Sequence, residues 1–350
     1  MKIKVWLTAA AVFISALGPA RAADVKLSGV VFGQYAHQLS NNNYKGDEGK
    51  DRGAFGISRI YMTGEAKYSP ELKAKVVLEG SSREIYVTSG TSNAVFVKNA
   101  FGEYVFNDRL SAAFGMIPTP WIDFEKEVWG RRFVQKTNLA QAGVLNSADL
   151  GAGLVGKLPR GYGEYHAVYV NGEGYNKDEK SKKDGRRKDV MLRVSLVPFS
   201  NSPHSGIGDL SGLKFHGYIQ QGRVSDGARQ LRDRYIAGVS YQKGKCHFMY
   251  YYLRGHDGDG TANRITNSWS AHGSYRLLRD FSLFGRYDSF RKAAAAGPEA
   301  YDRGTIGVDH KLADGARISL SDQWLQVVKS VSGSNKSNEN QLMAQFELKF

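Results

Sequence analysis

Seven ionisable side chains lie close together in the stretch 118–148 of the chain. Carboxylates occur near its start and further cations follow, in the order Asp123, Glu125, Lys126, Glu127, Arg131, Arg132 and Lys136. Acidic and basic groups that face each other across a narrow aqueous gap set up a transverse field, which orients water and sorts polar solutes by charge. A solvent-exposed loop with hydrated charges is the alternative. Trp121, Phe124 and Trp129 favour a packed loop.

Motifs for catalysis, cofactors and metals are weak in this sequence. His256-Asp257-Gly258-Asp259-Gly260 resembles the start of a calcium loop, but the later ligands and the bidentate glutamate are missing, so a surface turn is predicted there. Neither H-E-x-x-H nor G-x-S-x-G occurs. Cys246 is the one cysteine, which excludes a disulfide framework and multi-cysteine metal sites. We predict no enzyme and no catalytic, cofactor-binding or metal-binding residues.

The elements that must position the charges alternate between apolar and polar residues with a period of two. In the last segment Leu342, Ala344, Phe346, Leu348 and Phe350 share one parity, and polar residues dominate the other. Such alternation places the two sets on opposite faces of one strand. Sixteen segments show this pattern, near 25–37, 54–67, 72–81, 95–106, 110–117, 149–158, 163–170, 188–198, 213–223, 233–243, 245–254, 268–277, 281–290, 303–312, 316–326 and 340–350.

The connections alternate between short turns and long polar loops, with one exception, a long link at 199–212. The long loops lie at 38–53, 82–94, 118–148, 171–187, 224–232, 255–267, 291–302 and 327–339. Short periplasmic turns, long extracellular loops and an even number of strands are typical of transmembrane β-barrels. The predicted fold is therefore all-β, a transmembrane antiparallel β-barrel of about 16 strands. It forms one outer-membrane domain over 23–350, whose longest connection lies at 118–148.

A secreted β-sandwich is the alternative fold, because a shared core can produce the same parity. The apolar parity mixes Gly and Ala with aromatic residues, which fill a close-packed core poorly. The chain has 40 Gly and 36 Tyr and Phe, and a mean hydropathy of −0.42 excludes a polytopic helical membrane protein. In lipid only a closed ring of strands satisfies every backbone group. Sixteen strands leave an aqueous channel inside such a ring.

Residues 1–22 have the pattern of a cleaved secretory signal peptide. Lys2 and Lys4 precede an apolar run from Val5 to Leu17, and small residues follow at Ala20 and Ala22. The run is too short to span a bilayer, although an uncleaved anchor is the alternative. The formal charge is +14, or +11 without the three basic residues of this segment. Export makes nucleic acid an improbable partner, so the positive charge calls for anionic solutes or surfaces.

The polar parity assigns eleven cations to the lumen of the predicted barrel. They are Arg59, Lys73, Lys75, Lys157, Arg193, Lys214, Arg234, Arg276, Arg286, Lys311 and Arg317. Seven acids share that parity: Glu65, Glu79, Glu103, Glu164, Asp288, Asp309 and Glu347. A net positive lumen concentrates anions, so a mild anion preference is predicted. The alternative is that these charges only solvate the lumen and pair with one another.

The leader, the sixteen-strand pattern and the aromatic last residue together resemble a Gram-negative outer-membrane porin. Lys98-Asn99-Ala100-Phe101-Gly102-Glu103-Tyr104 and Gly115-Met116-Ile117-Pro118-Thr119-Pro120 are most similar to the phosphate-selective porin O/P group. That group's arginine ladder and lysine cluster have no recognisable counterpart here, so phosphate specificity is not carried over. The resemblance implies a homotrimer in the outer membrane and an inward-folding loop near 118–148 that narrows the pore. It also implies that Phe350 is an assembly signal for the barrel-assembly machinery.

The expected function is a water-filled channel for passive diffusion of small anionic or neutral hydrophilic solutes. Outer-membrane lipid and lipopolysaccharide are its expected surroundings. The strongly charged run 177–188 either gathers anions and lipopolysaccharide or is simply a solvated loop, and the second reading is favoured. Two other functions stay open at this point: a structural or adhesive surface barrel, and a sleeve for a redox partner.

Overall fold

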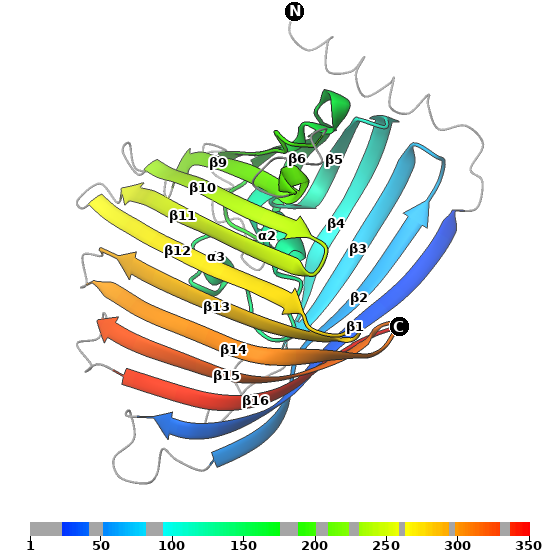
Figure 1. Cartoon of the computed structure of the whole chain (residues 1–350). Coiled ribbons are helices and arrows are strands. Elements are labelled where there is room, and N and C mark those ends of the chain that lie inside the picture. The colour runs from blue at the N-terminus through cyan, green and yellow to red at the C-terminus, as the bar shows by residue number, and fades with distance from the viewer. Residues whose placement is uncertain are drawn as a thin grey trace, which may run out of the picture.

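A computed structural model shows a single ring of sixteen antiparallel strands (Figure 1). It describes residues 23–41, 52–81, 94–175, 188–200, 209–223, 231–258, 263–293, 298–329 and 337–350. The predicted signal peptide, most of the run 177–188 and much of the long loops lie outside these ranges. No helix in the described part of the chain is both long and apolar enough to cross a membrane.

The predicted all-β barrel of sixteen strands is confirmed. The strands are β1 (Asp24–Asn41), β2 (Arg52–Lys67), β3 (Leu72–Ser81), β4 (Ala94–Asn107), β5 (Leu110–Pro118), β6 (Ala148–Lys157), β7 (Gly163–Val170), β8 (Asp189–Leu196), β9 (Leu213–Arg223), β10 (Leu231–Lys243), β11 (Cys246–Gly258), β12 (Asn263–Arg276), β13 (Phe281–Lys292), β14 (Glu299–Ala313), β15 (Ala316–Lys329) and β16 (Ser337–Lys349). Several extend past the predicted ends on the long-loop side, because the ladder of backbone hydrogen bonds continues into polar residues that no apolar alternation marks.

The ring closes where β1 pairs with β16, in a register that runs from Val30 opposite Lys349 to Asn41 opposite Glu339. Closure leaves no unpaired strand edge for lipid to cover. The last residue takes part, since the amide of Phe350 donates to the carbonyl of Gly29 at 3.0 Å and the reverse bond is 2.7 Å. The Phe350 ring lies over Gly29, where an added Cβ would come within 2.4 Å of it.

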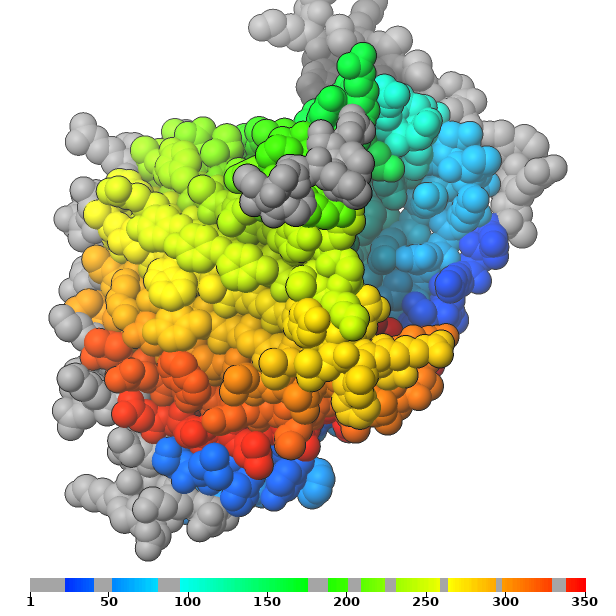
Figure 2. All heavy atoms as spheres, in the orientation of Figure 1, coloured from blue at the N-terminus to red at the C-terminus, as the bar shows by residue number. Residues whose placement is uncertain are grey.

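The two parities of each strand face different surroundings. Outward-pointing Leu27, Phe114 and Ile306 are 75 %, 74 % and 59 % exposed, as expected of side chains that meet lipid. Figure 2 shows the outer wall over β10–β15 as a continuous layer of side chains. Inward-pointing Arg286 and Gln345 are buried although they are polar. The barrel therefore carries its polar side chains inside, where another part of the chain packs on them.

The link between β8 and β9 breaks the short-turn pattern, as the sequence indicates. Its described part ends in the 3-10 helix η3 (Leu210–Gly212), where Asp209 accepts the amide of Ser211 at 3.0 Å. The link between β6 and β7 is a tight turn containing the 3-10 helix η2 (Pro159–Gly161). The long connection between β5 and β6 differs from both, because it enters the barrel.

Candidate pore constriction

The chain between β5 and β6, residues 119–147, lies inside the barrel and is called the inner loop below (Figure 1). Its backbone carbonyls accept hydrogen bonds from inward side chains of distant strands. Arg193 of β8 donates to Pro120 at 3.0 Å, Arg286 of β13 donates to Lys136 at 2.8 Å, and Gln345 of β16 donates to Val134 at 2.8 Å. The inner loop therefore runs along the wall from β8 to β16.

Helix α2 (Pro120–Trp129) positions the first charges of the inner loop. Proline stands in its first turn, and Gly130 ends it with a left-handed φ of 60°. Trp121 packs edge-on against Tyr251 of β11 at 5.3 Å between ring centroids, and Trp129 packs likewise against Phe284 of β13 at 6.1 Å. One face of the helix is thus fixed to the wall. The second helix, α3 (Asn138–Gln141), is a single turn.

The opposite face of α2 carries Asp123, Lys126 and Glu127 toward the lumen. Asp123 and Lys126 form an ion pair of 2.5 Å. Asp123 is also within electrostatic range of Lys75 on β3 and His166 on β7. The inner loop therefore presents acids to a wall that carries cations, which is the arrangement expected for opposed charges at a narrowing.

Glu125 differs from its predicted place in the constriction. It is 0 % exposed and points at the barrel wall, where the Tyr251 hydroxyl donates to its Oε1 at 2.9 Å. Arg131 is also turned to the wall, with its Nε 2.6 Å from Asp309 Oδ2 and its guanidinium over the Phe284 ring. Both residues fasten the inner loop: Glu125 lies on the face of α2 that packs on the wall, and Arg131, just after the helix, is held by its ion pair with Asp309.

Glu125→Gln is expected to weaken the pH dependence of the free energy of unfolding. Burial raises the pKa of Glu125 from 4.5 to about 7, so the folded barrel binds this proton more tightly than the unfolded chain. Stability should therefore fall as the pH rises from about 4.5 to 7, by up to about 3 kcal/mol. Glutamine keeps an acceptor for Tyr251 and carries no charge. Urea unfolding at pH 5 and pH 8 measures the free energy of unfolding of wild type and variant. An equal change in this free energy between the two pH values in both proteins would contradict the prediction.

Cations gather between the inner loop and strands β2–β4. Arg59 Nε lies 3.1 Å from Glu79 Oε1, and Lys98 Nζ lies 2.6 Å from Glu79 Oε2. Both cations also donate to the Tyr61 hydroxyl, at 3.0 Å and 3.1 Å. Arg132 of the inner loop also forms a hydrogen bond with this hydroxyl. One phenol and one carboxylate therefore organise three cations.

Lys136 completes this group, which is called the constriction cluster: Arg59, Glu79, Lys98, Arg132 and Lys136. Desolvation inside the barrel and the nearby charges of Arg59 and Arg132 lower the pKa of Lys136 to about 8. Its ammonium is therefore mainly protonated at pH 7. Four cations stand against one carboxylate, which gives the cluster a net charge of +3. One Arg132 nitrogen, Nη1, is buried with no hydrogen-bond partner among the described residues.

The other cations predicted to line the pore fall into two groups. Arg193, Arg234 and Arg286 are buried and paired with Glu164, Asp257 and Asp288. For these three arginines the structure shows the pairing that the sequence analysis left open as the alternative. The second group keeps water contact: Lys73, Lys75, Lys157, Lys214, Arg276, Lys311 and Arg317 are exposed or half-buried. Arg317 additionally donates to the Gly130 carbonyl at 2.6 Å.

Lys98 belongs to the constriction cluster and Tyr61 accepts hydrogen bonds from it, but the alternation of polar and apolar residues predicted neither. The register between β3 and β4 shifts between Val77 and Leu78, so Lys98 sits in a bulge and joins the inward side. A bulge leaves no mark in a two-residue pattern. Tyr61 follows Arg59 at the right parity, but an aromatic side chain gives no sign of a lumen position.

Metal ligands do not cluster in the part of the chain that the structure describes. Among the described residues, no group of three His, Cys, Asp or Glu side chains is placed to hold a metal. Asp257 of the calcium-loop-like segment is instead paired with Arg234 at 3.0 Å. Cys246 lies exposed at the start of β11. The concentration of charge at the inner loop is the feature that calls for a function.

Solved structures of outer-membrane proteins share the fold of this closed sixteen-strand barrel. The anion-selective porin of Comamonas acidovorans superposes with a TM-score of 0.62 at 16 % identity, covering 94 % of this chain and 100 % of that one. The trimer form of OmpT from Vibrio cholerae gives 0.59 at 14 % with the same coverage. The channel DcaP of Acinetobacter baumannii gives 0.60 at 11 %, covering 94 % and 98 %. No family model and no curated protein sequence matches.

Proposed function

We propose that this protein is an outer-membrane porin that lets small hydrophilic solutes diffuse passively, with a mild preference for anions. The constriction cluster carries the proposal, because its net charge of +3 stands where the inner loop approaches β2–β4. A positive site in a narrow, low-dielectric passage attracts anions and repels cations. The fold shared with porins of known structure supports the channel itself.

The remaining parts of the proposal concern assembly. The protein is exported with an N-terminal signal peptide that is cleaved after residue 22. Phe350 serves as the signal that the barrel-assembly machinery recognises. The Phe350 ring is 70 % exposed on the outside of the closed barrel, where a partner can contact it. A homotrimer embedded among lipopolysaccharide is the proposed final state, and one of the similar structures is a trimer. Preference for phosphate over other anions is not part of the proposal.

Conductance in planar lipid bilayers tests the proposal. Purified, folded protein should open ohmic channels, and a tenfold KCl gradient should give a reversal potential of the sign expected for chloride preference. A reversal potential on the cation side would refute the selectivity but keep the channel. A folded barrel that never conducts would refute the channel and favour a structural or adhesive barrel, or a sleeve for another protein.

A further inference from the structure

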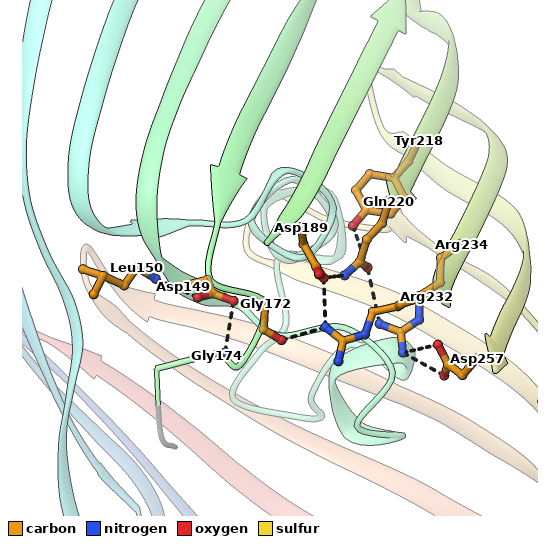
Figure 3. Close-up of polar contacts among 10 residues, drawn as sticks. All are labelled: Asp149, Leu150, Gly172, Gly174, Asp189, Tyr218, Gln220, Arg232, Arg234 and Asp257. Atoms are coloured by element: carbon orange, nitrogen blue, oxygen red, sulfur yellow. Dashed lines mark hydrogen bonds and ion pairs between the residues drawn. The ribbon is translucent and has the colours of Figure 1, made fainter. Parts of the chain in front are cut away.

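The start of the loop after β7, residues 171–175, is held to the inside of the barrel (Figure 3). The Gly172 carbonyl accepts from Arg232 Nη1 of β10 at 2.7 Å, and the Gly174 amide donates to Asp149 Oδ2 of β6 at 3.0 Å. The Asn171 amide also donates to the Leu150 carbonyl at 2.9 Å. Three consecutive attachments within four residues fix the path of this segment.

The side chains that hold the segment are themselves fixed. Asp189 of β8 is 0 % exposed and accepts from Arg232 at 2.8 Å and from Gln220 of β9 at 2.5 Å. Gly172 lies directly on this carboxylate, since an added Cβ would come within 2.6 Å of Asp189 Oδ1, and its φ is +84°. A residue with a side chain would not fit there. Residues 171–175 are called the clipped segment below. Buried, paired charges hold the segment in place, and Gly172 leaves room for the Asp189 carboxylate.

Tyr175 stands at the end of the clipped segment and reaches the constriction cluster. Its hydroxyl donates to Glu79 Oε2 of β3 at 3.2 Å, and Lys98 Nζ lies 5.6 Å from its ring centroid. Strands β4, β5 and β6 separate β3 from β7 in the barrel wall. The tyrosine thus extends from one part of the wall to another, next to the cations. Its ring occupies lumen space, and its hydroxyl shares the one carboxylate of the cluster.

We infer that residues 171–175 form a second narrowing element of the channel, and that Tyr175 helps to set both the width of the passage and the strength of its positive charge. The inference rests on the proposed channel function. Asp149, Asp189 and Arg232 act as positioning residues, because they touch the segment and not the passing solute. The inner loop narrows the lumen from one side and the clipped segment narrows it from another.

Single-channel conductance of two kinds of variant tests this inference. Tyr175→Ala should conduct about 1.5-fold more than wild type, because ring volume leaves the passage. The double variant Asp189→Asn/Arg232→Met releases the Gly172 carbonyl while leaving no buried unpaired charge, and should raise conductance although Tyr175 is intact. Tyr169→Ala is the matched control, since Tyr169 lies on β7 but is 57 % exposed on the outer surface. It should behave as wild type.

The possible outcomes distinguish a failure of this inference from a failure of the proposed channel function. Wild-type conductance in both Tyr175→Ala and the double variant would overturn the inference and leave the porin intact. If wild type never conducts, thiol labelling of Tyr175→Cys in a Cys246→Ser background decides instead. A cysteine at a narrowing should react far more slowly with a bulky reagent than with a small one. Equal rates for both reagents would overturn the inference without any channel recording.

Discussion

Replacing Arg132 and Lys136 together by glutamine is expected to lower the permeability ratio of chloride to potassium by roughly threefold. The two changes reduce the net charge of the constriction cluster from +3 to +1. Both residues belong to the inner loop, and Lys136 keeps contact with the lumen. The charge is therefore removed at the narrowing, where a low-dielectric wall focuses the field most strongly. The ratio is read from reversal potentials in a KCl gradient.

The control removes two positive charges from the lumen away from the inner loop. Arg276→Gln/Lys311→Gln changes exposed residues near the short-turn end of β12 and β14. It should change the ratio much less than the cluster variant, because wider and wetter surroundings screen these charges. Equal effects of the two pairs would show that total lumen charge, and not the constriction cluster, sets selectivity. If neither pair of substitutions lowers the permeability ratio, the anion preference does not arise from these charges.

Arg286→Leu is expected to destabilise the barrel by about 3–5 kcal/mol. The guanidinium is paired with Asp288 at 2.8 Å, donates to the Lys136 carbonyl and lies 5.3 Å from the Trp129 ring centroid. Leucine would leave Asp288, which is 0 % exposed, charged and without its main partner. It would also release the middle of the inner loop. Urea unfolding of the folded protein in detergent measures the change in the free energy of unfolding.

Two further variants show whether the loss arises as argued. Arg286→Leu/Asp288→Leu removes both charges and should recover most of the stability, because replacing a buried pair costs far less than breaking it. Arg276→Gln, at an exposed arginine, should cost less than about 1 kcal/mol. If the double variant is no more stable than Arg286→Leu, the unpaired charge is not the cause. Single-channel records of Arg286→Leu should also show a noisier open state as the inner loop loosens.

The barrel could be predicted from the sequence because its surroundings impose a simple rule. One face of each strand meets lipid and the other meets water, so alternation with a period of two appears in every crossing. The same rule places Arg59, Lys75 and Glu79 on the inner side. The length of the connection 118–148 and its tryptophans indicated a long, packed loop, and the resemblance to porins implied that it folds inward.

The candidate site could be predicted only in part. Arg132 and Lys136 stand at the constriction cluster, whereas Glu125 and Arg131 turn to the wall, because Glu125 lies on the packed face of α2 and Arg131 pairs with Asp309. The role of each side chain thus depended on docking that alternation does not encode. Lys98 reaches the site because a β-bulge turns it inward, and Tyr175 reaches it because residues 171–175 of a long loop are held inside the barrel.

By itself, the sequence determined that the protein is a sixteen-strand barrel with a polar, positively charged interior. That information is local, since a strand's two faces are read from neighbouring residues. Only the tertiary structure decided which charges pair and which stay open. Arg193, Arg234 and Arg286 share a parity with Lys75 and Lys214, yet the first three are buried in ion pairs. At the constriction cluster a net charge of +3 remains, where two connections from separate parts of the chain meet the wall at β2–β4.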